Sequence, residues 1–312
     1  MPTLQDIQSY AAIAGVVVGT GTLAFLLNFI REQREQAKLH LEVLRERLKA
    51  IEEDRDRTEK WSKRKEEELA TENRKLQADL QSALSASGFT LESLAMGRSI
   101  RDVSIELQHT LETALEKAHS AELADPKTQS PEWHLSLAQG YMAQRDWKLA
   151  AEHFDSYTSL RPDDHEAQFS KGVSYANMRG GNESNHTALR AYNEAIAFLP
   201  ANADKNWVAR CYAYRAAVMR RLGRYDEAEN DLALALRYSA EDYERSDVIY
   251  NLATVYALQG RRSEMLGMVK QLLSRRHLQE IRSHLNDNFS AYATDTEFLD
   301  LLASQIGKAA MA

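Results

Sequence analysis

The sequence has few of the residues on which small cross-linked or metal-binding modules depend. It contains one cysteine, Cys211, so an intramolecular disulfide and a Cys-x-x-Cys zinc module are both excluded. Cys211 falls on the first helix of the third copy of a repeated pattern described below, so we interpret it as a small core residue rather than a reactive thiol. The formal net charge of −7 leaves no basic surplus of the kind that binds nucleic acid.

Motifs of catalysis are missing as well. The chain has no H-E-x-x-H pair, no G-x-x-x-x-G-K-[ST] phosphate loop and no G-x-S-x-G elbow. Its nine histidines are scattered along the sequence. Asp163, Asp164 and His165 follow Pro162, a position typical of helix-capping residues rather than of metal ligands. We therefore expect no catalytic residue, no cofactor and no metal, and a protein that is not an enzyme.

Proline and glycine are absent between residues 31 and 84, where acidic and basic residues are often spaced for pairing on a helix surface. The segment 31–84 is therefore predicted to be one long charged helix. Along it runs an apolar seam of Leu41, Leu44, Leu48, Ile51, Leu69, Asn73, Leu76 and Leu80. The seam favours a coiled coil in which the asparagine fixes the register. Polar residues interrupt its middle, so an isolated stiff spacer is the alternative.

One long apolar run is present, at residues 11–30 after a short tail of residues 1–10. It carries no charge, and no basic residue precedes it, so it predicts an uncleaved transmembrane helix rather than a signal peptide. Lysine and arginine follow the run. The expected topology therefore has the N-terminus outside and the bulk of the chain cytoplasmic, as in a bacterial inner membrane, with a periplasmic placement left open. Gly15 and Gly19 form a ridge that favours helix pairing.

A pattern of small and large residues recurs four times between Pro131 and Ser274. In the first copy, Leu137 and Tyr141 lie on one face of a first helix, and Ala150 and Phe154 lie on one face of a second. The copies span residues 131–164, 165–202, 209–240 and 246–274. Each helix pair leaves one face bare, so the copies are expected to stack on one another.

This pattern resembles the tetratricopeptide (TPR) repeat family, whose period is about 34 residues. The resemblance covers Pro131 to Ser274, and it departs from the family at Arg215 and Met265, where aliphatic residues and alanine are usual. It implies a right-handed α-solenoid. The expected fold is thus all-α, with a transmembrane helix, a coiled-coil-like helix, and about four TPR-like helix pairs with capping helices.

Three further segments complete the predicted organisation. Gly88 and Gly97 favour a hinge at 85–99. An apolar stripe in 100–130 predicts a capping helix and a linker, or half of a degenerate repeat. Aromatic and leucine residues in 275–312 predict capping helices that cover the other end of the stack.

The resemblance also suggests a binding surface. In TPR proteins, the concave face of the first helices commonly binds an extended peptide or a helix of a protein partner. Carried over position by position, the expected partner-binding residues are Gln139, Phe169, Val173, Asn177, Arg210, Arg220, Tyr250 and Thr254, with Leu135, Met142, Ala213 and Ala217 on the same face. Arg210, Arg220 and Arg221 could anchor an acidic side chain or a helix terminus, and the favoured alternative is that they are solvated or paired with Asp226 and Glu227.

The hypothesis from sequence is a membrane-anchored scaffold or adaptor that forms a homo-oligomer through its stalk and recruits a protein partner, with no role for nucleic acid. Three alternatives stay open. They are a periplasmic cell-envelope assembly factor, a sensor or effector subunit of a membrane-acting defence-type system, and an organelle receptor.

Overall fold

The computed structural model describes residues 20–124, 130–178, 180–239, 242–274 and 288–309, and every element among them is helical. The contacts divide the chain into two compact units, with the division between Thr71 and Glu72. The all-helical repeat fold that the sequence predicts is confirmed.

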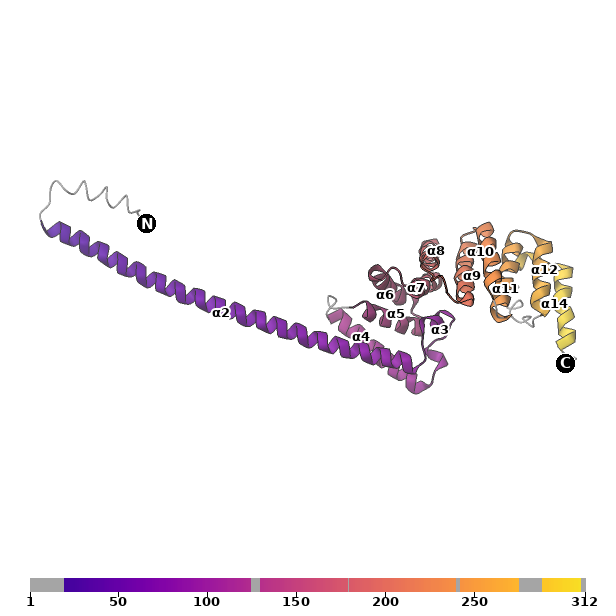
Figure 1. Cartoon of the computed structure of the whole chain (residues 1–312), viewed down its shortest axis with the longest axis horizontal. Helices are drawn as coiled ribbons and strands as arrows, with labels where there is room; N and C mark the ends of the chain where they lie inside the picture. The colour runs from indigo at the N-terminus through magenta and orange to yellow at the C-terminus, as the bar shows by residue number, and fades with distance from the viewer. Residues whose placement is uncertain (1–19, 125–129, 179, 240–241, 275–287, 310–312) are drawn as a thin grey trace. The chain divides into compact units, whose positions relative to one another are not determined.

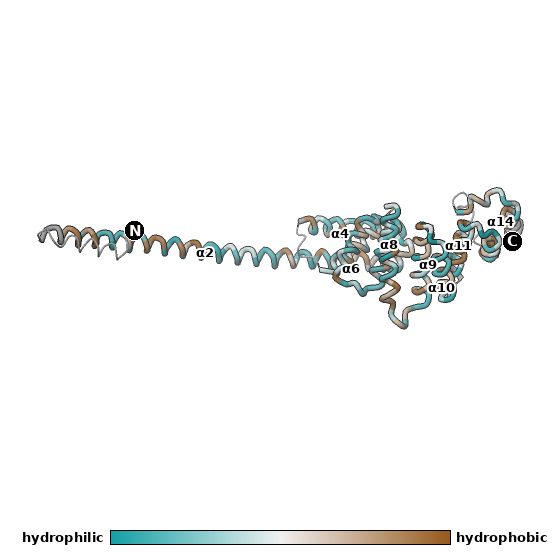
Figure 2. Tube along the Cα trace, turned by 90° about the horizontal axis from the view of Figure 1, so that it is seen from above, coloured by the Kyte–Doolittle hydropathy of each residue, from teal (hydrophilic) through white to brown (hydrophobic). Residues whose placement is uncertain are grey.

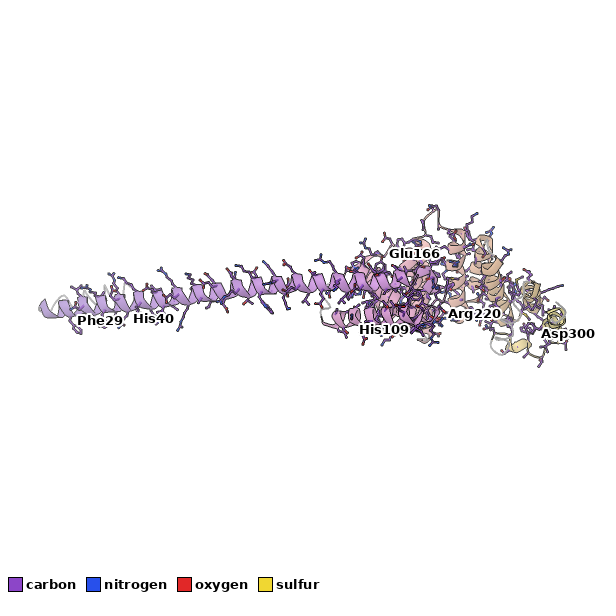
Figure 3. All side chains as sticks on the ribbon, turned by 90° about the horizontal axis from the view of Figure 1, so that it is seen from below. Phe29, His40, His109, Glu166, Arg220 and Asp300 are labelled. Carbon is purple, nitrogen blue, oxygen red and sulfur yellow. The ribbon has the colours of Figure 1, made fainter. Side chains whose placement is uncertain are left out.

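Helix α2 runs from Thr20 to Ala86 (Figure 1). Between residues 25 and 71 its side chains project above and below the helix in the view of Figure 3, and most of them are exposed. Figure 2 shows that hydrophilic residues dominate its middle. Exposed pairs such as Lys63–Glu59, 2.8 Å apart, connect successive turns as the charge spacing predicts.

The structure corrects the prediction of a transmembrane helix at residues 11–30. Residues 11–19, with Gly15 and Gly19, lie outside the described residues, and α2 continues from Ile30 into charged sequence without a break. A membrane span needs about 20 consecutive apolar residues. No helix within the described residues is both long and apolar enough to cross a membrane. The single-pass topology with a cytoplasmic bulk is therefore wrong.

The repeats form four helix pairs, each joined by a short turn. The pairs are α5 (Pro131–Gln144) with α6 (Trp147–Leu160), α7 (His165–Asn177) with α8 (Gly181–Ala197), α9 (Lys205–Arg221) with α10 (Tyr225–Tyr238), and α11 (Asp242–Leu258) with α12 (Arg262–Ser274). Asp164 caps α7 by accepting a bond from the Ala167 amide at 3.0 Å, which confirms its predicted capping role. Gly223, with a φ of 74°, makes the left-handed turn between α9 and α10.

Small residues allow the paired helices to approach closely. A Cβ atom on Gly172 of α7 would lie 2.6 Å from the ring of Tyr192 on α8, so only glycine fits there. Cys211 is fully buried, and burial raises the pKa of its thiol to about 12. It is therefore a core residue, as the sequence indicates.

Polar contacts join each repeat to the next. Tyr175 on α7 donates to Asp155 on α6, and Tyr256 on α11 donates to Glu229 on α10 at 3.1 Å. Arg215 of α9 donates to Asn193 on α8 at 2.9 Å. Because each contact crosses from one helix pair to its neighbour, these bonds fix the register of the stack.

The N-terminal end of the stack is covered by the last turns of α2, by α3 (Leu91–Ala95), by a 3-10 turn (η1, Ile100–Asp102) and by α4 (Ile105–Ala124). Here the structure differs from two predictions, because residues expected in the self-association seam and in the hinge are buried against the repeats. Leu80 is 1% exposed and Leu76 packs against the same core, so these two residues at the end of the seam are not free to pair with a second chain. Phe89, in the predicted hinge, is also buried.

The C-terminal end is covered by a 3-10 turn (η2, Ser290–Tyr292) and by α14 (Thr296–Ala309), which packs on α12. Phe289, Phe298 and Leu302 are buried there. They cap the stack as predicted, and the part of the predicted cap at residues 275–287 lies outside the described residues.

Candidate functional site

A groove follows the first helices of the repeats. It has a volume of about 490 Å³ and lies between α3, α7, α9 and α11. Ala213 and Ala217 of α9 leave room on its floor, and polar side chains surround them. The polar residues at the groove include Arg145, Asn177, Arg210, Tyr214, Arg221, Ser239, Asp247, Tyr250 and Asn251.

The segment that contains α3 forms one wall of this groove, and side-chain donors hold it there. Arg210 pairs with the Glu92 carboxylate. The Tyr214 hydroxyl donates to the Ala95 carbonyl at 3.2 Å, and Arg145 donates to the Gly97 carbonyl at 3.0 Å. The first helices therefore already bind a short segment of the chain itself, through one ion pair to its single glutamate and two bonds to backbone carbonyls.

This wall is a fixed part of the unit. Phe89, Leu91 and Leu94 are buried, the last of them to 1% exposure. Burying one such side chain contributes about 1.5–3 kcal/mol, so exposing all three would cost about 5 kcal/mol or more. A ligand of ordinary affinity would bind beside α3 in the open part of the groove and would leave α3 in place.

The structure brings some of the predicted partner-binding residues to this groove. Val173, Asn177, Arg210 and Tyr250 all line it, although Val173 is almost entirely buried. Arg221, on the last turn of α9, is exposed and donates to the Ala176 carbonyl at 2.7 Å.

Other predicted residues lie elsewhere. Phe169 is fully buried against Tyr192, Trp207 and Tyr214, and Thr254 is fully buried with its hydroxyl bonded to the Tyr250 carbonyl. Neither can contact a partner in this conformation. Gln139 is half-buried and does not line the groove.

Arg220 is set apart from Arg221 although the two are adjacent in sequence. Its guanidinium donates to Asn288 at 3.3 Å, and burial lowers its pKa. Adjacent residues on a helix point about 100° apart, so one of the pair faces the C-terminal cap and the other the groove.

Sequence reasoning missed Arg145, Tyr214 and Asn251 at the groove, as well as Glu92. Asn251 directly follows the predicted Tyr250, so the helical period could have included it. No local pattern assigns Arg145 or Glu92, because their contact partners lie 48 and 118 residues away in sequence.

A second polar cluster lies between α4 and the first helix pair. Glu122 of α4 meets His153 of α6 at 3.4 Å and His134 of α5 at 4.0 Å, and the two histidines are 3.3 Å apart. Burial raises the pKa of Glu122 to about 7, lowers that of His134, and lowers that of His153 to about 4. The histidines that are scattered in the sequence thus meet in the fold.

No protein-family model matches the sequence, and no curated protein matches it. Several solved structures are similar to the fold. TTC0263, a thermophilic TPR protein of Thermus thermophilus, shares 21% identity over 57% of this chain and 90% of its own, with a TM-score of 0.41. MamA shares 19% identity over 57% of this chain and 98% of its own, with a TM-score of 0.45. The APC/C hetero-tetramer Cut9-Hcn1 shares 16% identity over 75% of this chain and 46% of the matched chain, with a TM-score of 0.34.

Proposed function

We propose that this chain is a non-catalytic scaffold whose groove binds an acidic segment of a protein partner. The observation that carries the proposal is the α3 wall, where Arg210 holds Glu92 and where Tyr214 and Arg145 hold backbone carbonyls. These are contacts that a bound peptide also offers.

The open part of the groove has the chemistry for a second segment of this kind. Arg221 is exposed at its edge, and a guanidinium pairs with a carboxylate through two parallel bonds. Asn177 and Asn251 supply amides that can donate to and accept from a peptide backbone. The alanine floor leaves room for side chains of the bound segment.

The charged side chains at the groove indicate which kind of partner segment it would bind. Three arginines and one aspartate line the groove, and the Glu92 carboxylate of the α3 wall already pairs with Arg210. The groove therefore keeps a surplus of one positive charge on a chain whose net charge is −7. The groove arginines attract an acidic segment, and they disfavour a basic segment at the same place.

Selection from a displayed library of random 12-residue peptides tests the proposal. We expect the peptides retained by the full chain to be enriched in aspartate and glutamate. Arg221→Glu should weaken their binding at least about 10-fold, because it replaces an attractive charge with a repulsive one.

Arg237→Glu is the matched control, because Arg237 is exposed on α10 and does not line the groove. It changes the net charge by the same amount and should leave binding within about twofold. Retained peptides without acidic enrichment, or equal effects of the two reversals, would refute the proposal.

We further propose that the first half of the seam on α2 mediates self-association. Leu41, Leu44, Leu48 and Ile51 are between 48% and 66% exposed, at spacings of three and four residues. A parallel pair of helices would bury these four side chains from each chain.

Disulfide trapping tests this second proposal. With Cys211 buried, Leu48→Cys introduces the one accessible thiol within the described residues, and mild oxidation should give a disulfide-linked dimer. Glu46→Cys, on the opposite face of the helix, should not cross-link. A monomeric Leu48→Cys protein after oxidation would rule the seam out.

A further inference from the structure

We propose that Glu122, His134 and His153 form a binding site for a divalent transition-metal ion of the zinc type, which ties α4 to the first helix pair. The three residues come from three different helices, α4, α5 and α6. An ion held by all three would therefore cross-link the cap to the start of the repeat stack.

The geometry of the donor atoms supports the site. One donor atom from each residue can be chosen so that all three lie within 4.8 Å of one another. A tetrahedral zinc ion with bonds of about 2.0–2.1 Å needs donors about 3.4 Å apart. Two contacts have this separation, His153 Nε2 to the Glu122 carboxylate at 3.4 Å and His153 Nδ1 to His134 Nδ1 at 3.3 Å, and they use different nitrogens of the His153 ring.

Binding would require the side chains to rearrange. His153 presents Nε2 to Glu122 and Nδ1 to His134, and a metal ion takes one nitrogen from each ring. The proposal therefore includes a turn of the imidazoles that brings the three donors from within 4.8 Å of one another to the closer separation that zinc needs. Tyr141 stacks on the His153 ring at 5.4 Å and would limit how far that ring moves.

Burial makes the cluster costly without an ion. The side chains of His153, His134 and Glu122 are only 9%, 14% and 16% exposed. Buried carboxylate oxygens and ring nitrogens need polar partners, and a metal ion bound by all three residues would supply one to each of them.

His119 lies close enough to contribute. It is one turn before Glu122 on α4, and its Nδ1 is 3.8 Å from the Glu122 carboxylate. This nitrogen is buried and has no hydrogen-bond partner within the described residues. It can serve as a fourth ligand, or it can orient the carboxylate from outside the coordination sphere.

The donor set selects the class of metal. Imidazole suits zinc, copper, nickel and iron, whereas calcium and magnesium prefer sites built wholly from oxygen. With two or three imidazoles, one carboxylate and no thiolate, zinc and its spectroscopic substitute cobalt are the natural probes.

The test uses the full chain purified without a polyhistidine tag and treated with a chelator that is then removed. Co²⁺ is added, and the visible absorption of tetrahedral cobalt is recorded. We expect one equivalent per chain, displacement by Zn²⁺, and a rise in the thermal unfolding midpoint with Zn²⁺. Glu122→Gln and His134→Gln should each weaken binding at least about 100-fold.

His109→Gln is the matched control, because His109 is exposed on the same helix α4 (Figure 3). It should bind cobalt as the unaltered chain does. Circular dichroism checks that each variant remains helical, and either ligand variant alone suffices if the other does not fold. Absence of the cobalt absorption from the unaltered chain would overturn the proposal and would identify the cluster as a metal-free hydrogen-bonded group. Equal binding by the folded ligand variants would also overturn it.

Discussion

The two halves of the seam on α2 are alike in sequence and differ in structure. Leu41 to Ile51 and Leu69 to Leu80 follow the same spacing of three and four residues. Leu48 in the first half is 59% exposed, whereas Leu80 in the second half is 1% exposed against the repeat core. A periodic apolar stripe thus shows that a helix face needs a cover, and it does not show which segment supplies that cover.

Two charged pairs also differ in burial although both are pairs of opposite charge. Glu59 and Lys63 on α2 are both exposed to solvent. Arg215 and Asp231 form two bonds of 2.7 and 2.8 Å in the repeats, where the side chains are 18% and 7% exposed. Arg215 departs from the TPR pattern, and the structure explains it, because Asp231 and Asn193 satisfy its guanidinium in place of an aliphatic contact.

The largest effect is expected from truncation of the buried half of the seam. Leu80→Ala should lower the free energy of unfolding of the repeat unit by about 3 kcal/mol, because it leaves a cavity in the core. Leu48→Ala should change it by less than about 0.5 kcal/mol. Urea unfolding followed by tryptophan fluorescence measures both.

Both leucine substitutions are made in a chain that also carries Trp61→Phe, so that no tryptophan on α2 contributes to the fluorescence signal. Trp61 is exposed on α2, and the other three tryptophans lie in the repeats, with Trp133 and Trp207 buried and Trp147 partly buried, so the remaining fluorescence reports on the repeat unit. If the two leucine substitutions changed the free energy of unfolding equally, the two halves of the seam would not differ in burial.

A smaller contrast is expected between the charged pairs. Asp231→Ala should cost about 2 kcal/mol, because it leaves a largely buried guanidinium with one hydrogen bond to Asn193 and the face of the Tyr212 ring in place of its carboxylate partner. Glu59→Ala should cost less than about 0.5 kcal/mol, since exposed pairs on a helix contribute little. The same urea titrations decide, and a neutral Asp231→Ala would mean that the buried pair does not stabilise the stack.

The smallest contrast concerns two helical glycines. Gly172→Ala should destabilise the repeat unit by about 1–2 kcal/mol, because its Cβ would meet the buried Tyr192 ring. Gly267 on α12 has open space around it, so Gly267→Ala should stabilise the unit by about 0.5–1 kcal/mol. Thermal unfolding midpoints that move in the same direction would contradict this account of the packing.

The sequence predicts the features that are local. The four helix pairs, the cap at Asp164 and the turn at Gly223 each depend on residues within a few positions of one another. The packed segment around Phe89 was predicted as a hinge because two glycines flank it. Its partners on α5 and α7 are too distant in sequence for any local pattern to indicate them.

The candidate sites were harder to predict for the same reason. Phe169 and Asn177 lie on one helix, and only the packing of α9 decides that the first is core while the second lines the groove. His134 and His153 are 19 residues apart, on helices that no zinc motif joins. Their meeting with Glu122 depends on how α4 packs, which the helical period alone does not specify.

Site-specific photo-crosslinking tests the central claim most directly. A photoreactive amino acid is placed at Ala217 in the groove or at Arg237 outside it, and labelled acidic peptides from the library are added. The groove account predicts crosslinks from position 217 that an excess of unlabelled peptide suppresses, and none from position 237. Peptides that bind the chain and yet crosslink equally from both positions, or from position 237 alone, would contradict it.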